Sequence, residues 1–144
     1  MTSALRVGSP AQRGSCAEER IVARILPVTP GAARLARTTT QVACSSWAVP
    51  EVCEVAVLAV SELVGNAVRH NGDGARGTLT LRLSMTARRL RLEVVDSSAG
   101  RPTVKRPPAD AEGGRGLWLI SELSTRWGVE PAPPGKCIWV EVAL

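Results

Sequence analysis

Two short runs of alternating residues constrain the fold more than any other feature of this chain. In Thr78–Met85 and in Arg89–Asp96, apolar residues recur at every second position, which is the pattern of a strand with one buried side and one solvent-facing side. Only three residues separate the runs, too few for a crossover, so we predict an antiparallel hairpin. Other elements of the chain must cover its apolar side.

A long helix is the first candidate for such a cover. It is predicted over residues 50–71, because Pro50 suits the first helical turn and Asn71-Gly72 is a common helix stop. The run 55–60 between these ends is apolar nearly all round, which indicates a largely buried helix. Polar side chains within this helix therefore require a specific explanation.

Glu62 and Asn66 are such polar groups. Because they are four residues apart, they lie one turn from each other on nearly the same side of the helix. A carboxylate beside a carboxamide offers a proton acceptor and an uncharged oxygen ligand, which suits a hard cation such as Mg²⁺. The same spacing also fits two helix-rim residues that hydrogen-bond to neighbours, so the pair alone does not decide between these interpretations.

Further alternation predicts a strand over residues 19–27, at an edge of the sheet. Two more strands, 125–130 and 136–143, are predicted around the proline-rich turn 131–135. The apolar side of the edge strand consists of three residues, Ile21, Ala23 and Ile25.

A second helix is predicted over residues 30–48, with Thr29 as its N-cap and Pro30 at its first position. Leu35, Val42 and Trp47 are expected to face the core. Helices followed by hairpins favour the α+β class. We therefore predict a two-layer α/β sandwich, in which the helices pack on one face of a mixed, mostly antiparallel sheet.

Length and composition indicate one domain. The first 19 of the 144 residues are rich in Ser, Gly, Ala and Arg and lack the apolar centre of a signal peptide, so we predict a disordered leader before a domain over residues 20–144. No apolar run approaches the roughly 20 residues of a membrane helix. We expect a cytoplasmic protein without a membrane partner.

The charge and the cysteines narrow the function further. The net charge of +5 comes from arginines scattered along every element, and no Phe or Tyr is present to stack on bases, so nucleic acid is not expected as a partner. The four cysteines show no C-x-x-C spacing and the chain has one histidine, which argues against a zinc site. Reduced, mostly buried thiols are expected instead.

A long loop and a glycine-rich segment follow the hairpin. Asp96 ends the second strand, and residues 97–113 have no periodicity, which is typical of a functional lid or a disordered segment. Residues 112–123 then open a helix behind three glycines. Glycines there let the backbone approach a ligand closely, and the free N–H groups at a helix start form an anion site.

These features occur in an order that resembles the histidine-kinase-like ATPase superfamily, which includes gyrase, MutL and the sensor histidine kinases. The form E-L-V-x-N-A-x-x-H of residues 62–70 is most similar to the anti-sigma-factor serine kinases of bacterial partner switching. The resemblance covers roughly residues 20–144 and implies the Bergerat ATP-binding fold, with ATP and Mg²⁺ as cofactors. No G-x-x-x-x-G-K-[ST] motif is present, which excludes a P-loop.

The resemblance also implies roles for the matching residues. Glu62 matches the acid that acts as general base, Asn66 the asparagine that holds Mg²⁺ against the phosphates, and Asp96 the aspartate that recognises the adenine amino group. Residues 114–116 match the second glycine box. The implied set is Glu62 as catalytic residue, Asn66 as metal ligand, and Asn66, Asp96, Gly100, Gly114, Arg115, Gly116 and Leu117 as ATP-binding residues.

One departure leaves two functions open. The first glycine box of the family, D-x-G-x-G, reads Asp96-Ser-Ser-Ala-Gly100 here, so Ser98 replaces a glycine. The first hypothesis is a serine/threonine kinase that phosphorylates an anti-sigma-factor antagonist and otherwise holds a sigma factor. The second is an ATP-binding module that grips a protein partner without phosphoryl transfer. The presence of Glu62 favours the kinase, and the altered glycine box favours the binding module. The sequence does not determine the oligomeric state, and a homodimer is possible.

Overall fold

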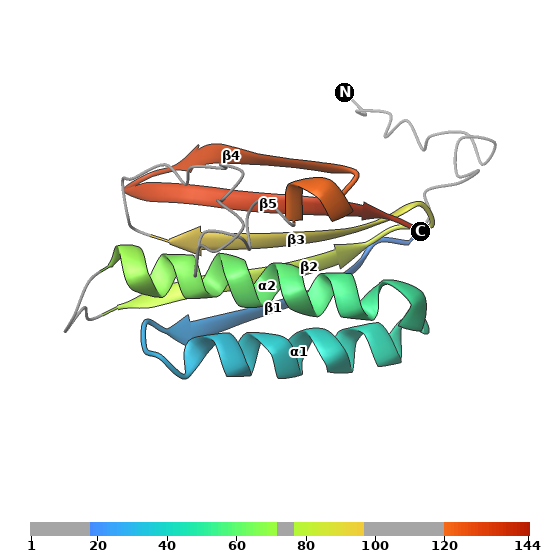
Figure 1. Ribbon diagram of the computed structural model, residues 1–144, viewed down its shortest axis with the longest axis horizontal. Helices are drawn as coiled ribbons and strands as arrows, with labels where there is room; N and C mark the ends of the chain where they lie inside the picture. Colours follow the sequence, from blue (N-terminus) through green and yellow to red (C-terminus); the bar gives the residue numbers. More distant parts are fainter. Residues whose placement is uncertain (1–17, 72–76, 97–119) are drawn as a thin grey trace, which may run out of the picture.

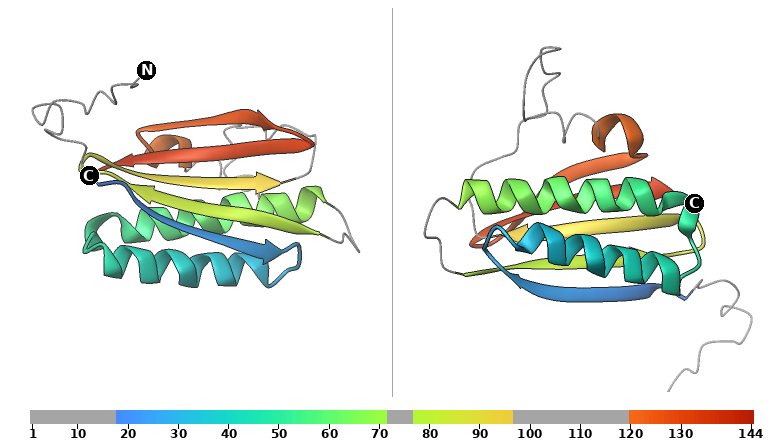
Figure 2. Two further views of the ribbon diagram at one scale, coloured as in Figure 1. Left: turned by 180° about the vertical axis from the view of Figure 1, so that it is seen from behind. Right: turned by 60° about the horizontal axis from the view of Figure 1, so that its bottom comes forward.

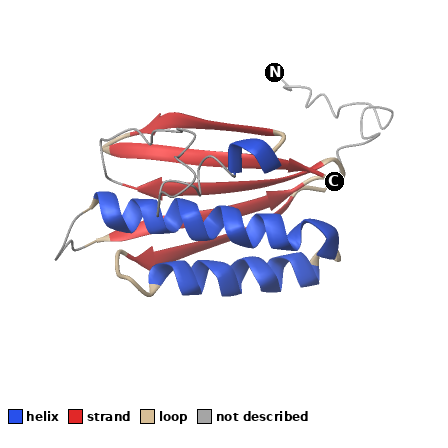
Figure 3. Ribbon diagram, viewed as in Figure 1, coloured by secondary structure: helices blue, strands red, loops and turns tan. Residues whose placement is uncertain are grey.

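The computed structural model describes residues 18–71, 77–96 and 120–144. In chain order the elements are β1 (Arg20–Pro27), α1 (Ala32–Ser46), α2 (Pro50–His70), β2 (Thr78–Met85), β3 (Arg89–Asp96), β4 (Arg126–Ala132) and β5 (Gly135–Ala143). The strands form one sheet in the order β1-β2-β3-β5-β4, and every neighbouring pair is antiparallel. Both helices lie on one face of this sheet (Figures 1 and 3). The predicted two-layer α+β sandwich with a mostly antiparallel sheet is confirmed.

The hairpin has the predicted bounds, and the long helix starts at Pro50 as predicted and ends one residue before the predicted end. β2 and β3 coincide with the two alternating runs, and their register places Leu83 opposite Leu92. Pro50 stands in the first turn of α2, and the N–H of Asn71 bonds to the Ala67 carbonyl at 3.2 Å where the helix ends. The alternation and the end signals were therefore sufficient to predict these elements.

The core lies between the sheet and the helices. On the strands it consists of the residues whose side chains point toward α1 and α2, and we call this side the helix-covered face. Its fully buried members include Leu26, Leu79, Leu81, Leu83, Leu90, Leu92, Val94, Ile138 and Val140. From α2, Leu63 and Val64 fill the space against them. No described helix covers the opposite side, the helix-free face, which carries Ile21, Arg82, Glu93, Trp139 and Glu141 (Figure 2).

The predicted burial of β1 is wrong. Ile21 and Ile25 are 50% and 69% exposed, whereas Leu26 is fully buried. The register with β2 explains this, because Leu26 pairs with Leu79 and so points into the core, while the two isoleucines point to the helix-free face. The prediction of an edge strand is confirmed, since β1 pairs only with β2.

The predicted ends and core side of α1 are also wrong. The helix begins at Ala32 with Gly31 in the cap position and no side-chain cap, so Thr29 is not the N-cap. Leu35 and Val42 are 37% and 60% exposed. Short side chains allow close approach to α2 and the sheet, and they form the buried side of α1: Ala32, Ala36, Thr39, Thr40, Ala43 and Cys44. Trp47, just past the helix, packs partly against the core as predicted.

The remaining predictions meet the described residues only in part. The leader, apart from its last two residues, and the whole predicted lid lie outside them. Of the predicted glycine-led helix, only residues 120–123 are described, and they are helical. None of the described helices has the length and apolar composition needed to cross a membrane.

Candidate functional site

Asp96 is a buried acid on the apolar side of the sheet. It is the last residue of β3, and alternation along that strand places it on the helix-covered face with Leu92 and Val94. Only 4% of its surface is exposed. An ionised carboxylate in such a position needs a partner.

Lys136 supplies a positive charge beside this acid. It lies directly opposite Asp96 on β5, is 5% exposed, and its Nζ is 3.7 Å from Oδ1 of the aspartate. A buried ion pair loses the hydration of both charges, so such a pair is weak evidence for a purely stabilising role. Sequence reasoning missed Lys136. Its place at the start of the last predicted strand was visible, but its position opposite Asp96 needed the pairing of β3 with β5.

Glu62 and Asn66 lie on the side of α2 that is turned away from α1. The α1-facing side is marked by Ser61, whose hydroxyl accepts a hydrogen bond from Arg37 of α1 at 3.1 Å. At about 100° per residue, Glu62 lies about 100° and Asn66 about 140° further round the helix. Both side chains are half-buried. They therefore border the core without being sealed inside it.

The final turns of α2 and the end of β3 lie at the same end of the molecule. Figures 1 and 2 show this from three directions, and the start of β5 lies at the same end. The Asp96–Lys136 pair and the Asn66 region thus share one end of the fold. The predicted residues Gly100, Gly114, Arg115, Gly116 and Leu117 lie outside the described residues, so their roles stay predictions.

Arg69 contacts the predicted metal ligand. Its guanidinium donates a hydrogen bond to Oδ1 of Asn66, three residues earlier in α2. The guanidinium also passes close to Gly65, where a Cβ would lie 3.4 Å from Nη1 of Arg69, about the distance of an ordinary contact. Sequence reasoning missed this contact, although a spacing of three residues on a helix was a signal for it. A cation is thus already held at the amide oxygen of Asn66.

The donor set at this end fits a magnesium nucleotide. A carboxylate and an amide oxygen one helical turn apart are ligands of the type that Mg²⁺ prefers. A buried carboxylate at a strand end can accept a hydrogen bond from an exocyclic amino group such as that of adenine. The described residues therefore suit the two ends of such a ligand.

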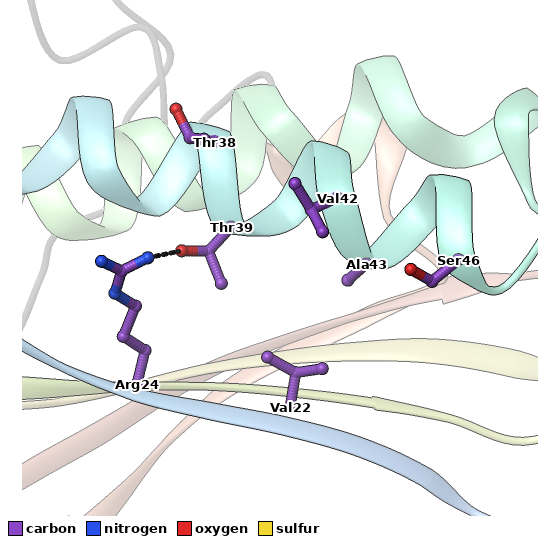
Figure 4. Close-up of a pocket in the computed structure, with 7 residues that line it drawn as sticks. All are labelled: Val22, Arg24, Thr38, Thr39, Val42, Ala43 and Ser46. Carbon is purple, nitrogen blue, oxygen red and sulfur yellow. Dashed lines mark hydrogen bonds between the residues drawn. The ribbon is translucent and has the colours of Figure 1, made fainter.

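A hollow of about 190 Å³ lies elsewhere, between α1 and β1. Figure 4 shows Arg24 reaching from the strand to Thr39 on the helix, with a hydrogen bond of 3.2 Å. Val22, Val42 and Ala43 add apolar surface to its lining, and Thr38 and Ser46 add two hydroxyl groups. It contains none of the predicted site residues and no cluster of ionisable groups, so it is not the predicted nucleotide site.

Comparison with known proteins agrees with the fold. The histidine kinase-like ATPase domain family matches residues 26–142. Among solved structures, the chain is similar to the crystal structure of the RsbU and RsbW domains of Rv1364c from Mycobacterium tuberculosis, with a TM-score of 0.66 and 18% identity. That similarity covers 85% of this chain and 31% of the other, and it shows a common fold. No curated protein gives a match. Because the family match extends over most of the chain, this protein belongs to the histidine kinase-like ATPase family.

Proposed function

We propose that this protein is an ATP-binding regulator of partner switching that phosphorylates a serine or threonine of an anti-sigma-factor antagonist and otherwise holds a sigma factor. The observation that carries the proposal is the gathering of two polar pairs at one end of an ATPase-family domain, Glu62 with Asn66 and Asp96 with Lys136. The motif over residues 62–70 supports the partner class, because it resembles that of anti-sigma-factor serine kinases. The similar solved structure contains an RsbW domain, which agrees with this assignment.

Binding and orientation of the nucleotide fall to Asp96 and Asn66 in this proposal. The Asp96 carboxylate accepts a hydrogen bond from the adenine amino group, and Lys136 holds that carboxylate in place through the ion pair. The Asn66 side-chain oxygen is the ligand for Mg²⁺. When bound, Mg-ATP would supply the phosphoryl group, and its Mg²⁺ would neutralise charge on the phosphates.

Glu62 acts as general base. Its half-buried carboxylate accepts the proton of the incoming serine or threonine hydroxyl as the oxygen attacks. Its place on the side of α2 away from α1 leaves it outside the helix–helix contact that Arg37 and Ser61 make. The rest of the catalytic effect is positioning, as is usual in phosphoryl transfer.

A second candidate function is an ATP-binding module that holds its partner without phosphoryl transfer. Two observations favour it. Ser98 stands where the family has a glycine, and Arg69 occupies the oxygen of Asn66 that a metal would use. Both would weaken productive binding of Mg-ATP.

The two functions separate in a phosphorylation assay with labelled ATP and candidate antagonist proteins. Glu62→Gln keeps the shape of the side chain and removes the base, so we expect phosphorylation to slow by about 10²-fold or more with ATP affinity within a few-fold of the parent. Asn66→Ala should instead lose Mg-dependent affinity. Glu54→Gln, an exposed position on the same helix, is the matched control and should change neither.

Each unfavourable outcome has a distinct meaning. Phosphorylation by Glu62→Gln at the parental rate would remove the general-base role from Glu62. A parent protein that binds Mg-ATP and the antagonist but never transfers phosphate would establish the binding module. A parent protein that binds no adenine nucleotide would reject both functions.

A further inference from the structure

Two cysteines from neighbouring helices stand at the same level of the structure. α1 and α2 run antiparallel (Figure 1), and the hydrogen bond between Arg37 and Ser61 fixes their register. Cys44 follows Arg37 by seven residues, about 10.5 Å along α1, and Cys53 precedes Ser61 by eight, about 12 Å along α2. Because the helices are antiparallel, going toward the C-terminus of α1 and going toward the N-terminus of α2 both lead to the same end of the helix pair. The two thiols are therefore brought together near the link between the helices.

A backbone hydrogen bond in the segment that links α1 to α2 also places the two cysteines close together. The N–H of Val49, which caps α2, bonds to the carbonyl of Cys44 at 3.0 Å. Cys53 lies four residues after Val49, one turn further along the same side of α2. The end of α1 and the start of α2 are thus joined by a backbone contact directly beside the two cysteines.

Both thiols line one cavity. It has a volume of about 390 Å³, and both Cys44 and Cys53 belong to its lining. The other lining residues, Gln41, Ser45, Ala48 and Pro50, are exposed at the surface. A small molecule can therefore reach this position from solvent.

The two thiols differ in accessibility. Cys44 is 1% exposed, whereas Cys53 is half-buried. Burial raises the pKa of the Cys44 thiol to about 12, and the charge of the Cys53 thiol and a hydrogen bond between the two side chains add to the increase. Because the thiolate is the reactive form, Cys44 is protected from direct attack. Cys53 is the residue that meets a reagent first.

We propose that Cys44 and Cys53 form an oxidative modification site, in which hydrogen peroxide converts the two thiols into a disulfide between α1 and α2. The Cys53 thiolate attacks one peroxide oxygen, the O–O bond breaks, and Cys53 sulfenic acid and one water form after protonation. The sulfur of Cys44 then forms the S–S bond as the S–O bond of Cys53 breaks, and the oxygen leaves with the proton of the Cys44 thiol as a second water. In total two thiols lose two hydrogens and two electrons, and one hydrogen peroxide becomes two waters.

Peptide mapping of the whole chain tests this directly. The protein is treated with hydrogen peroxide and then alkylated, and trypsin releases residues 38–69 with both cysteines on one peptide. We expect that peptide to lack two hydrogens and to carry no alkyl group. Cleavage after Glu51, between the cysteines, should leave its two parts joined until a reductant is added.

The other two cysteines serve as internal controls. Cys16 and Cys137 fall on separate tryptic peptides, so a bond to either is seen as a different cross-link. Burial raises the pKa of the Cys137 thiol to about 11, and this thiol should still be alkylated after unfolding. An alkylated peptide 38–69 after peroxide, or a bond from Cys53 to Cys16 or Cys137 in its place, would overturn the proposal.

Single variants test the order of events. Cys53→Ser should slow the oxidation of Cys44 at least tenfold, because the protected thiol has lost its reactive neighbour. Cys44→Ala should let Cys53 react at the parental rate but stop at sulfenic acid, which dimedone traps. Circular dichroism checks that each variant is folded, and the mapping of the parent protein stands without them. Equal oxidation of Cys44 with and without Cys53 would contradict the assigned order.

Discussion

The two faces of the sheet are stabilised by different kinds of interaction. The helix-covered face consists mainly of aliphatic side chains, such as Leu81, Leu92 and Val140, which are at most 1% exposed. The helix-free face carries a chain of ion pairs instead. Arg82 lies 2.7 Å from Glu93, and Arg91 lies 3.1 Å from Glu93 and 2.9 Å from Glu141.

An aromatic ring lies under this ionic layer. The guanidinium of Arg91 stands 4.3 Å from the ring centroid of Trp139, which is 9% exposed. On the neighbouring strand, Gly128 pairs with Trp139, and a Cβ at that glycine would come within 2.7 Å of the ring. The helix-free face thus buries its tryptophan without any helix, by placing an arginine over the ring and a glycine beside it.

The contrast between the two faces makes a charged pair on the helix-covered face unusual. Charges on the helix-free face, the buried Glu141 included, are parts of a continuous network of ion pairs, whereas the described strand residues that are both charged and buried on the helix-covered face are Asp96 and Lys136. Hydrophobic burial stabilises that face, and an ion pair there gains little. The exception coincides with the proposed nucleotide site.

The largest effect is expected from the apolar face. Leu92→Ala removes a fully buried side chain and should lower the free energy of unfolding by about 2 to 5 kcal/mol. Thr80→Ala, on the helix-free face of the neighbouring strand, should cost about 1 kcal/mol or less. Urea unfolding of both variants measures the difference. Equal losses would remove the distinction between the two faces.

The next largest effect is expected at the buried Asp96–Lys136 pair. Asp96→Asn leaves Lys136 with a neutral partner, which should destabilise the fold by about 1 to 3 kcal/mol and weaken adenine-nucleotide binding by a similar amount. Adding Lys136→Met should restore stability but not affinity, because the buried charge is gone while the acceptor is still missing. Calorimetry with ATP and urea unfolding report the two quantities separately. Unchanged ATP affinity in folded Asp96→Asn would reject the recognition role.

A smaller effect is expected where the tryptophan lies. Gly128→Ala places a methyl group against the ring of Trp139 and should cost roughly 1 kcal/mol through overpacking. The ring must move from under Arg91, so tryptophan fluorescence should change together with stability. Unaltered stability and emission would mean that the sheet absorbs the methyl group without disturbing the ring.

The smallest effect is the pH dependence of Glu93. Burial by itself would raise the pKa of this carboxyl, but the hydrogen bonds and charges of Arg82 and Arg91 outweigh it and hold the pKa below its ordinary value of 4.5. Because the folded-state pKa is the lower one, the stabilisation is complete above that ordinary value and is lost as the pH falls through the folded-state pKa. Glu93→Gln should therefore cost about 1 kcal/mol or less at neutral pH.

Unfolding curves at several pH values check this last expectation. The gap between the parent and Glu93→Gln should close as the solution becomes acidic, because the parent carboxyl then becomes protonated as well. A gap that stays constant down to the acid transition would assign the effect to packing rather than to charge.

The sequence predicted those parts of the fold that local patterns determine. β2 and β3 follow from strict alternation, and the ends of α2 follow from Pro50 and Asn71. The core side of α1 could not be found in this way, since hydrophobicity favours Leu35 and Val42 whereas close packing selects the alanines. Packing distance is a property of the assembled layers and is not visible in one segment.

The candidate site was predictable to a similar extent. Glu62, Asn66 and Asp96 stand out because they are polar groups within or at the end of apolar elements. Lys136 could not be paired with Asp96, because the register between β3 and β5 connects residues forty positions apart. The contact between Arg69 and Asn66 was accessible from helical spacing, but spacing does not tell which of several neighbours a flexible arginine contacts.

That contact has a thermodynamic consequence for the proposed nucleotide binding. Asn66 can hold Mg²⁺ through its side-chain oxygen only when the hydrogen bond from Arg69 is broken. The apparent dissociation constant for Mg-ATP then equals the intrinsic constant divided by the fraction of molecules in which this hydrogen bond is broken. Affinity for Mg-ATP is then set partly by an exchange of one cation for another. A partner protein that draws Arg69 toward its own acidic groups would increase that fraction and tighten nucleotide binding, and bound nucleotide would favour that partner by the same factor.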